Sequence, residues 1–192
     1  MLKIENGILV KCDDEFVNDL VIPDSVTEIG ESAFSLEFFE SVVIPNSVKK
    51  IGRFAFFCCT NLASSIVLPN SIISIEDYAF SSCRLESIII PNSVTKIGKG
   101  AFMSCGLASV IIPNSITEIE EDTFLCCSRL TSIVIPDSVT KIGERAFYKC
   151  RELTSVVIPD SVSEIGDWAF DLSDKLPEET KEKIRKINER AI

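Results

Sequence analysis

The stretch SIIIPNSVTKIGKGAFMSC, residues 87–105, carries the pattern that decides the fold of this chain. Three aliphatic residues precede Pro91, Asn92 and Ser93 follow it, and Phe102 comes 11 residues after the proline. The same pattern recurs at Pro23, Pro45, Pro69, Pro91, Pro113, Pro136 and Pro159. A unit of 22 to 24 residues cannot bury its own apolar face, so the copies must stack and share one continuous core.

Each copy contains the signals for a strand, a turn and a second extended piece. The β-branched residues before the proline favour a short strand, which the proline ends. Asp or Asn followed by Ser then favours a turn. An Ile six residues after each proline marks the second, less regular piece, and the pair Ala-Phe is expected in a helical or 3₁₀ turn with Phe inward. Gly follows this Ile in five copies, but Glu76 and Glu120 replace it, so a left-handed backbone is not required there.

Both ends of the repeat array carry residues that are expected to cap it. Residues 1–16 alternate around Asn6-Gly7, which predicts a hairpin. Pro177 and the acidic residues after it predict the start of a helix, whose apolar face would be formed by Ile184, Ile187 and Ala191. We therefore expect a hairpin cap over 1–16, seven repeats over 17–172 and a capping helix over 173–192.

Composition excludes several classes of protein. The 192 residues include no histidine, which argues against Ser-His-Asp and Cys-His catalysis and against histidine-ligated metals. The net charge of -10 disfavours binding to nucleic acid, which needs a basic surface. No apolar run is long enough to span a membrane, and no leader is recognisable at residues 1–10. On sequence alone we expect a cytoplasmic chain.

One cysteine column allows a functional and a structural interpretation. Cys59, Cys83, Cys105, Cys127 and Cys150 each lie three residues after the repeat Phe. A thiol column could serve metal or redox chemistry, but no CxxC spacing is present, so we favour buried packing residues. Cys58 and Cys126 stand outside this column and are expected to be exposed.

Several other features are assigned to structure rather than chemistry. The serine two residues after each proline has no base nearby, so we expect it to satisfy backbone donors at the turn. The carboxylate runs at residues 13–15 and 120–122 are interpreted as solvated charge. Phe39 falls in a core column, whereas Phe38 has no column to fill and is expected at the surface.

The column two residues before each proline is the candidate interaction surface. It consists of Val21, Val43, Val67, Ile89, Ile111, Val134 and Val157. Because neighbouring strand residues alternate between two faces, this column should point outward while the residues on either side of it enter the core. An exposed apolar row indicates an interaction surface. The alternative, which the sequence leaves open, is that β-branched residues are here simply good strand formers.

The unit S-I-x-I-P-x-S-V-T-x-I-G-x-x-A-F-x-x-C resembles the BspA-like leucine-rich repeats. This resemblance covers roughly residues 17 to 172 in seven copies. It implies a right-handed superhelical solenoid, mainly β, with a parallel sheet on the concave side and short helical or 3₁₀ turns on the convex side. It also implies interaction rather than catalysis, often by adhesins, and so allows a secreted or cell-surface location.

These observations favour a non-enzymatic module that binds a protein through its concave sheet. The partner is unidentified and could be a host or cell-surface protein. We expect no catalytic residue, no cofactor, no metal site, no nucleic acid, no membrane span and a monomeric chain. The alternative is a structural or adhesive repeat array, similar to a surface adhesin, without a dedicated ligand site.

Overall fold

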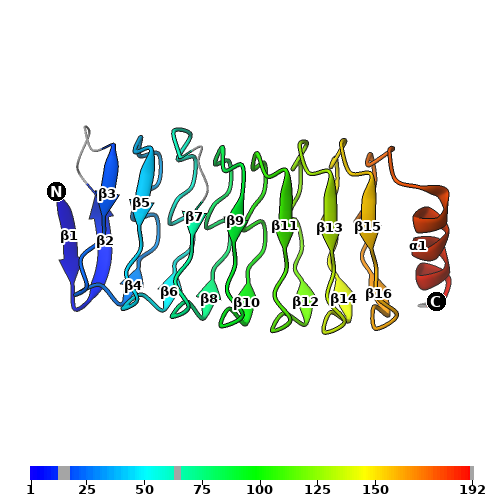
Figure 1. Ribbon diagram of the computed structural model, residues 1–192, viewed down its shortest axis with the longest axis horizontal. Coiled ribbons are helices and arrows are strands. Elements are labelled where there is room, and N and C mark those ends of the chain that lie inside the picture. The colour runs from blue at the N-terminus through cyan, green and yellow to red at the C-terminus, as the bar shows by residue number, and fades with distance from the viewer. Residues whose placement is uncertain (13–17, 63–65, 191–192) are drawn as a thin grey trace.

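The computed structural model describes residues 1–12, 18–62 and 66–190. It confirms the expected repeat solenoid: about seven turns follow one another in a nearly straight row, and a helix closes the C-terminal end (Figure 1). Each turn contributes two short strands, which pair with the strands of the neighbouring turns.

The first column of strands comes from the residues before the prolines. Its members are β3 (Asp19–Val21), β5 (Ser41–Val43), β7 (Ile66–Val67), β9 (Ile88–Ile89), β11 (Ser109–Ile111), β13 (Ser132–Val134) and β15 (Ser155–Val157). They pair in parallel and in register as β3-β5, β7-β9 and β11-β13-β15, for example Ile111 with Val134 and Val134 with Val157. Equivalent residues of successive repeats therefore lie side by side, and each sequence column becomes a row in space.

The second column is more regular than we expected. It is formed by β4 (Glu28–Ile29), β6 (Lys50–Ile51), β8 (Ser74–Ile75), β10 (Lys96–Ile97), β12 (Glu118–Ile119), β14 (Lys141–Ile142) and β16 (Glu164–Ile165). These strands also pair in parallel, in the orders β4-β6-β8-β10 and β12-β14-β16. The isoleucine that ends each one is buried in the core.

The turns around the repeat phenylalanine differ in one respect from the expected helical turn. Hydrogen bonds from Ala79 to Glu76 and from Ser81 to Tyr78 close them locally, three residues apart. Left-handed residues interrupt them, however, because Tyr78 has φ 56° and Ser82 has φ 62°, so no continuous helix forms. The amides in between point to the next repeat: Phe80 N–H donates to the carbonyl oxygen of Ala101 at 2.8 Å.

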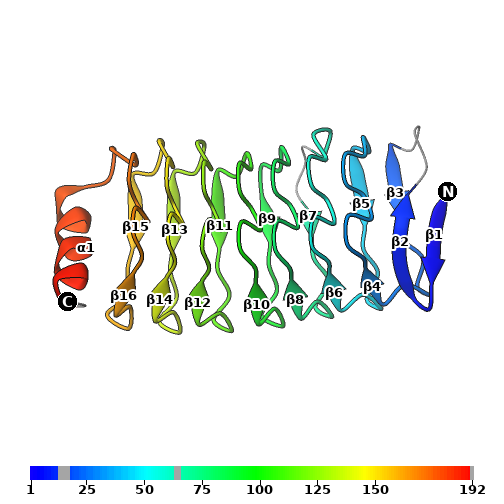
Figure 2. The same cartoon turned by 180° about the vertical axis from the view of Figure 1, so that it is seen from behind.

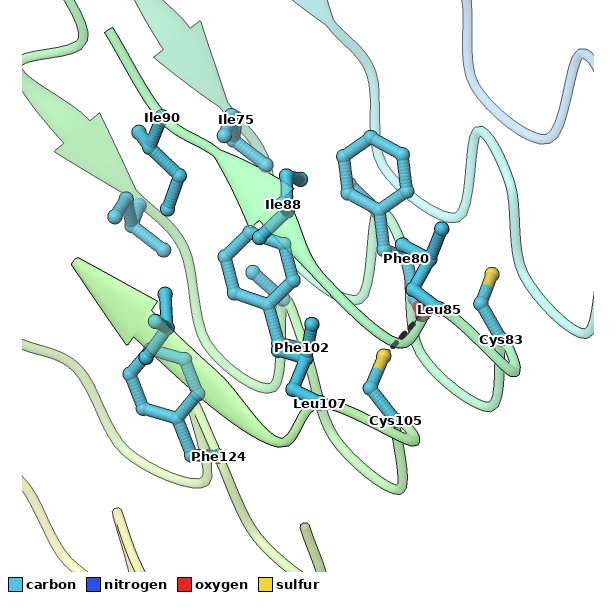
Figure 3. Close-up of a cluster of buried hydrophobic side chains, with 14 of the residues drawn as sticks. Ile75, Phe80, Cys83, Leu85, Ile88, Ile90, Phe102, Cys105, Leu107 and Phe124 are labelled. Atoms are coloured by element: carbon cyan, nitrogen blue, oxygen red, sulfur yellow. Dashed lines mark hydrogen bonds between the residues drawn. The ribbon is translucent and has the colours of Figure 1, made fainter. Parts of the chain in front are cut away.

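The core is built on a continuous stack of phenylalanines. Phe80, Phe102 and Phe124 are buried with nearly parallel rings, and adjacent ring centres are 5.7 Å apart (Figure 3). The stack continues in both directions, from Phe34 to Phe170. Each ring thus buries its faces against the preceding and following repeats, which is how a unit that cannot fold alone becomes stable.

Glycine is needed where two repeats approach closely. A Cβ added to Gly143 would lie 2.5 Å from the backbone nitrogen of Glu121 in the preceding repeat. Gly143 is not left-handed, in agreement with the sequence pattern, so its role is to make room rather than to turn the chain.

The two ends of the row are closed by different elements. Strands β1 (Leu2–Glu5) and β2 (Ile8–Cys12) form an antiparallel hairpin, and β2 continues the sheet by pairing with β4. At the other end, α1 (Glu178–Arg190) covers the last repeat and buries Ile187 (Figure 2). Ile184 packs against the core as well, whereas Ala191, the third residue expected on this helix face, lies outside the described residues.

Candidate functional site

The row of residues predicted to face outward does so along its whole length. We call it the apolar stripe, and it consists of Val21, Val43, Val67, Ile89, Ile111, Val134 and Val157. Between 54% and 79% of the surface of each residue is exposed, with Ile111 the most exposed. Strand β11 shows the cause, because Val110 and Ile112 on either side of Ile111 are 4% exposed and enter the core.

Uncharged polar rows border much of the apolar stripe. On one side lie Ser41, Ser87, Ser109, Ser132 and Ser155, while Ser65 of this row is outside the described residues. On the other side lie Asp24, Asn46, Asn70, Asn92, Asn114, Asp137 and Asp160, all exposed. The four amides occupy repeats two to five, and the carboxylates occupy the first repeat and the last two. This face therefore combines aliphatic groups with flanking hydroxyls and carboxamides, a combination found in protein interfaces.

The C-terminal end of the apolar stripe runs into a small groove. This groove of about 290 Å³ lies between β15 and α1 and is lined by residues that include Val157, Thr180 and Lys183. The Lys183 ammonium also contacts the Asp160 carboxylate at 2.8 Å. A cation of α1 thus sits beside the last residue of the stripe.

The cysteine column is a structural feature with a specific hydrogen bond. Its five thiols are buried, and each donates to the carbonyl oxygen of the repeat phenylalanine in the preceding repeat, as Cys105 does to Phe80 at 3.0 Å (Figure 3). Ser173 takes the same place in the last repeat and donates to Phe147 at 2.9 Å. Burial raises the pKa of the Cys127 thiol to about 12, so it stays protonated as a donor.

All eight cysteines of the chain are free thiols. Cys58 and Cys126, which we expected to be exposed, are half-buried. Within the described part of the chain, no group of three or more cysteine or acidic side chains is arranged so that it could hold a metal ion.

The serine column acts differently from our expectation. Ser71, Ser138 and Ser161 do not accept hydrogen bonds from backbone donors of their own turn. Instead each hydroxyl donates to a backbone carbonyl of the preceding repeat, over 2.6 to 2.8 Å. The reason is the in-register stacking, which places a free carbonyl of one repeat directly beside the serine of the next.

The carboxylates at 120–122 are not simply solvated charge, because they belong to an ion network between repeats. Arg145 contacts the Glu121 carboxylate at 2.8 Å and Asp122 at 3.0 Å, and Lys99 reaches Glu121 at 3.0 Å. Arg145 also donates a hydrogen bond from its Nη2 to Asp122 Oδ2 at 3.4 Å, while Arg145 Nε and Asp122 Oδ1 form an ion pair without hydrogen-bond alignment. Burial raises the pKa of Asp122 against the opposing effect of Arg145. The other acidic run, residues 13–15, lies outside the described residues.

Phe38 and Phe39 lie as expected. Phe39 is buried and packs edge-on against Phe34, with ring centres 5.4 Å apart. Phe38 exposes 63% of its surface. It precedes β5 and is not part of the apolar stripe, and we assign no site to it.

Sequence reasoning missed a row of charges next to the buried isoleucines of the second strand column. Lys141 lies between Glu118 at 3.4 Å and Glu164 at 3.2 Å, and Lys50 pairs with Glu28 at 2.9 Å. Opposite charges in successive copies of this column, interrupted only by Ser74, are visible in the sequence and would have predicted these cross-strand pairs. The row holds neighbouring repeats in register, and it lies outside the apolar stripe.

No helix in residues 1–12, 18–62 and 66–190 combines the length and apolar character needed to cross a bilayer.

Comparison with known proteins agrees with this architecture. The chain matches the family model described as BspA type leucine rich repeat region, in six copies over residues 3–65 and 63–177. No curated protein matches it.

Solved structures of bacterial leucine-rich repeat proteins are similar to the chain. The leucine-rich repeat protein of T. pallidum is 33% identical with a TM-score of 0.88, over 94% of this chain and 87% of that one. A leucine-rich cell surface protein of Faecalibacterium prausnitzii is 28% identical with a TM-score of 0.60, over 85% of this chain and 59% of that one. With its repeats, its sheet and this match over most of its length, the chain belongs to the BspA-type leucine-rich repeat family.

Proposed function

We propose that this chain is a non-enzymatic module that binds a protein partner through the apolar stripe. The observation that carries the proposal is the unbroken row of seven aliphatic residues, each more than half exposed. Single exposed aliphatic residues are ordinary on protein surfaces. A contiguous row over seven repeats is different, because removing so much apolar surface from water on binding lowers the free energy.

The chain itself argues against the simpler explanation that β-branched residues are there only to form strands. A second exposed row, four residues after each proline, includes Thr27, Thr95, Thr117 and Thr140. Threonine is also β-branched and favours extended backbone, yet it stays compatible with water. Strand propensity could have been met with threonine in the stripe as well, so the consistent choice of Val and Ile supports a contact role.

The absence of an obvious catalytic set supports the non-enzymatic part of the proposal. The sequence has no histidine, and the column cysteines are engaged as donors with raised pKa values, which makes them poor nucleophiles. Around Arg145, the carboxylates of Glu121 and Asp122 are engaged in ion pairs.

The test compares two triple variants with the same change in charge. In the first, Ile89, Ile111 and Val134 of the stripe are replaced by lysine. In the control, Thr95, Thr117 and Thr140 of the same three repeats are replaced by lysine. Circular dichroism first establishes that both variants fold. We expect proteins captured from native extract and identified by cross-linking to be lost with the stripe variant and kept with the control. Equal capture by both variants would remove the stripe from the proposal.

A second candidate function is an adhesive array at the cell surface without a dedicated ligand site. It is favoured by the near identity of the repeats, which present the same groups many times, and by the likeness to the Faecalibacterium prausnitzii cell surface protein. Antibody labelling of intact cells that express the chain tests the location. Labelling only after the cells are lysed would contradict this second function.

A further inference from the structure

We propose that the apolar stripe is covered by a second copy of this chain, with the two stripes packed face to face and the two arrays running in opposite directions. This inference rests on the proposed function, since it takes the stripe to be the contact surface and names its partner. A monomer is the simplest expectation from the sequence, and the geometry of the stripe is what points to a dimer.

The first argument is the spacing of the stripe. Equivalent residues lie side by side within the parallel pairs β3-β5, β7-β9 and β11-β13-β15, so within these groups the stripe offers one aliphatic group about every 4.8 Å. A partner that contacts the whole row must present apolar groups at the same interval. An extended strand presents them every ~6.8 Å and a helix every ~5.4 Å, so both move out of step within a few repeats. A second copy has the same interval by identity and stays in step over all seven repeats.

The second argument is the distribution of charge beside the stripe. Repeats two to five carry only Asn46, Asn70, Asn92 and Asn114 in the row after the proline. Two copies can therefore approach along the middle of the stripe without bringing like charges of this row together, although the chain has a net charge of -10.

The charges at the ends select the direction. The first repeat exposes Asp19 and Asp24, and the last repeat is followed by α1 with Lys183 beside Val157. If the arrays ran in the same direction, Asp19 and Asp24 would face their own copies. If they run in opposite directions, the first repeat of one chain faces the last repeat of the other, where Lys183 lies 2.8 Å from Asp160, so a cation accompanies the carboxylates at each end. The arrangement pairs Val21 with Val157, and it places Ile89 of the fourth repeat opposite Ile89 of the second chain.

The expected affinity follows from the size of the contact. The seam is one aliphatic side chain wide, which places it at the small end of specific interfaces, below about 1,200 Å² in total. Such interfaces are weak and reversible. We therefore expect dimerisation in the micromolar range, with a sedimentation coefficient that depends on protein concentration.

Sedimentation velocity over a concentration series tests the contact. Two single variants of the fourth repeat introduce the same charge, Ile89→Lys in the stripe and Thr95→Lys in the neighbouring exposed row. Ile89→Lys brings two ammonium groups together at the centre of the seam, so we expect at least a tenfold weaker dimer. Thr95→Lys should stay within twofold of the parent chain. An unchanged dimer with Ile89→Lys would overturn the proposal.

Disulfide trapping tests the direction, in a background where Cys58 and Cys126 are replaced by serine. We expect I89C to cross-link with itself. V21C and V157C should cross-link as a mixture of the two variants, and neither should do so alone. Self-cross-linking of V21C would refute opposite directions.

Sedimentation and the capture experiment together distinguish failure of the dimer from failure of the proposed function. A chain that stays monomeric up to several hundred micromolar but captures another protein through the stripe refutes the dimer and keeps the binding module. A monomer that captures nothing refutes both, and leaves the structural array.

Discussion

Removal of one ring from the phenylalanine stack tests the account of how the repeats hold together. Phe102 has no exposed surface, and it stacks on Phe80 and on Phe124 with interplanar angles of 5° and 10°. Phe170 at the end of the array is half-buried, and its stacking partner in the array is Phe147, 5.0 Å away. The two positions therefore carry the same residue in the same column with different numbers of neighbours.

The magnitudes follow from these contacts. Replacement of a buried Phe by Ala costs about 3–5 kcal/mol in free energy of unfolding. An aromatic pair contributes about 0.5–1.5 kcal/mol beyond burial, so Phe102→Ala loses two such pairs and Phe170→Ala loses one. With its smaller burial, we expect Phe170→Ala to cost about half as much as Phe102→Ala.

Equilibrium unfolding in urea, followed by circular dichroism, measures both variants against the parent chain. A cost for Phe170→Ala equal to or above that for Phe102→Ala would refute the idea that stability comes from contacts between neighbouring repeats. The slope of the transition adds an independent check. Loss of the central ring should lower it, because the halves of the array then unfold with less cooperativity.

Three further predictions concern single repeat positions. Gly143→Ala should cost about 1–3 kcal/mol, because its Cβ would overlap the preceding repeat, and an unchanged urea midpoint would contradict this. Cys105→Ser should keep the hydrogen bond to the Phe80 carbonyl, whereas Cys105→Ala should be less stable than Cys105→Ser by about 1 kcal/mol in the same assay. Burial by itself raises the pKa of Glu76, but hydrogen bonds from a lysine and a serine outweigh it and lower the pKa, so Glu76 stabilises the fold above its unfolded pKa and this contribution is lost as the pH falls. Burial raises the pKa of Glu120, so its charge costs stability at neutral pH and acid relieves that cost. In urea titrations at pH 7, Glu76→Gln should therefore lower the free energy of unfolding, and Glu120→Gln should not. A decrease for both variants would contradict the opposite effects that we assign to the two carboxylates.

Much of the fold follows from the chain alone because the repeat is so regular. The constant interval between each proline and its phenylalanine predicts one structural unit per copy. Alternation around Ile111 predicts which residues are buried and which form the apolar stripe, since a strand residue and its neighbours must point to opposite faces. The hairpin at Asn6-Gly7 and the helix after Pro177 are local signals of the same kind.

The contacts between repeats required the tertiary structure. A residue such as Ser71 or Cys105 donates to a carbonyl more than 20 positions earlier in the chain, and only the stacking register decides which carbonyl that is. Tyr78 has a left-handed conformation, and its amide and that of Phe80 donate hydrogen bonds to carbonyl oxygens of the next repeat. The sequence around Asp122 likewise suggests an exposed carboxylate, whereas in the structure it is buried against Arg145 of the next repeat. The sequence by itself determined the repeating unit and its inward and outward faces, because these depend on residue type and spacing. The tertiary structure decided the hydrogen-bond partners, the backbone strain and the ion network, because these depend on how one repeat lies against the next.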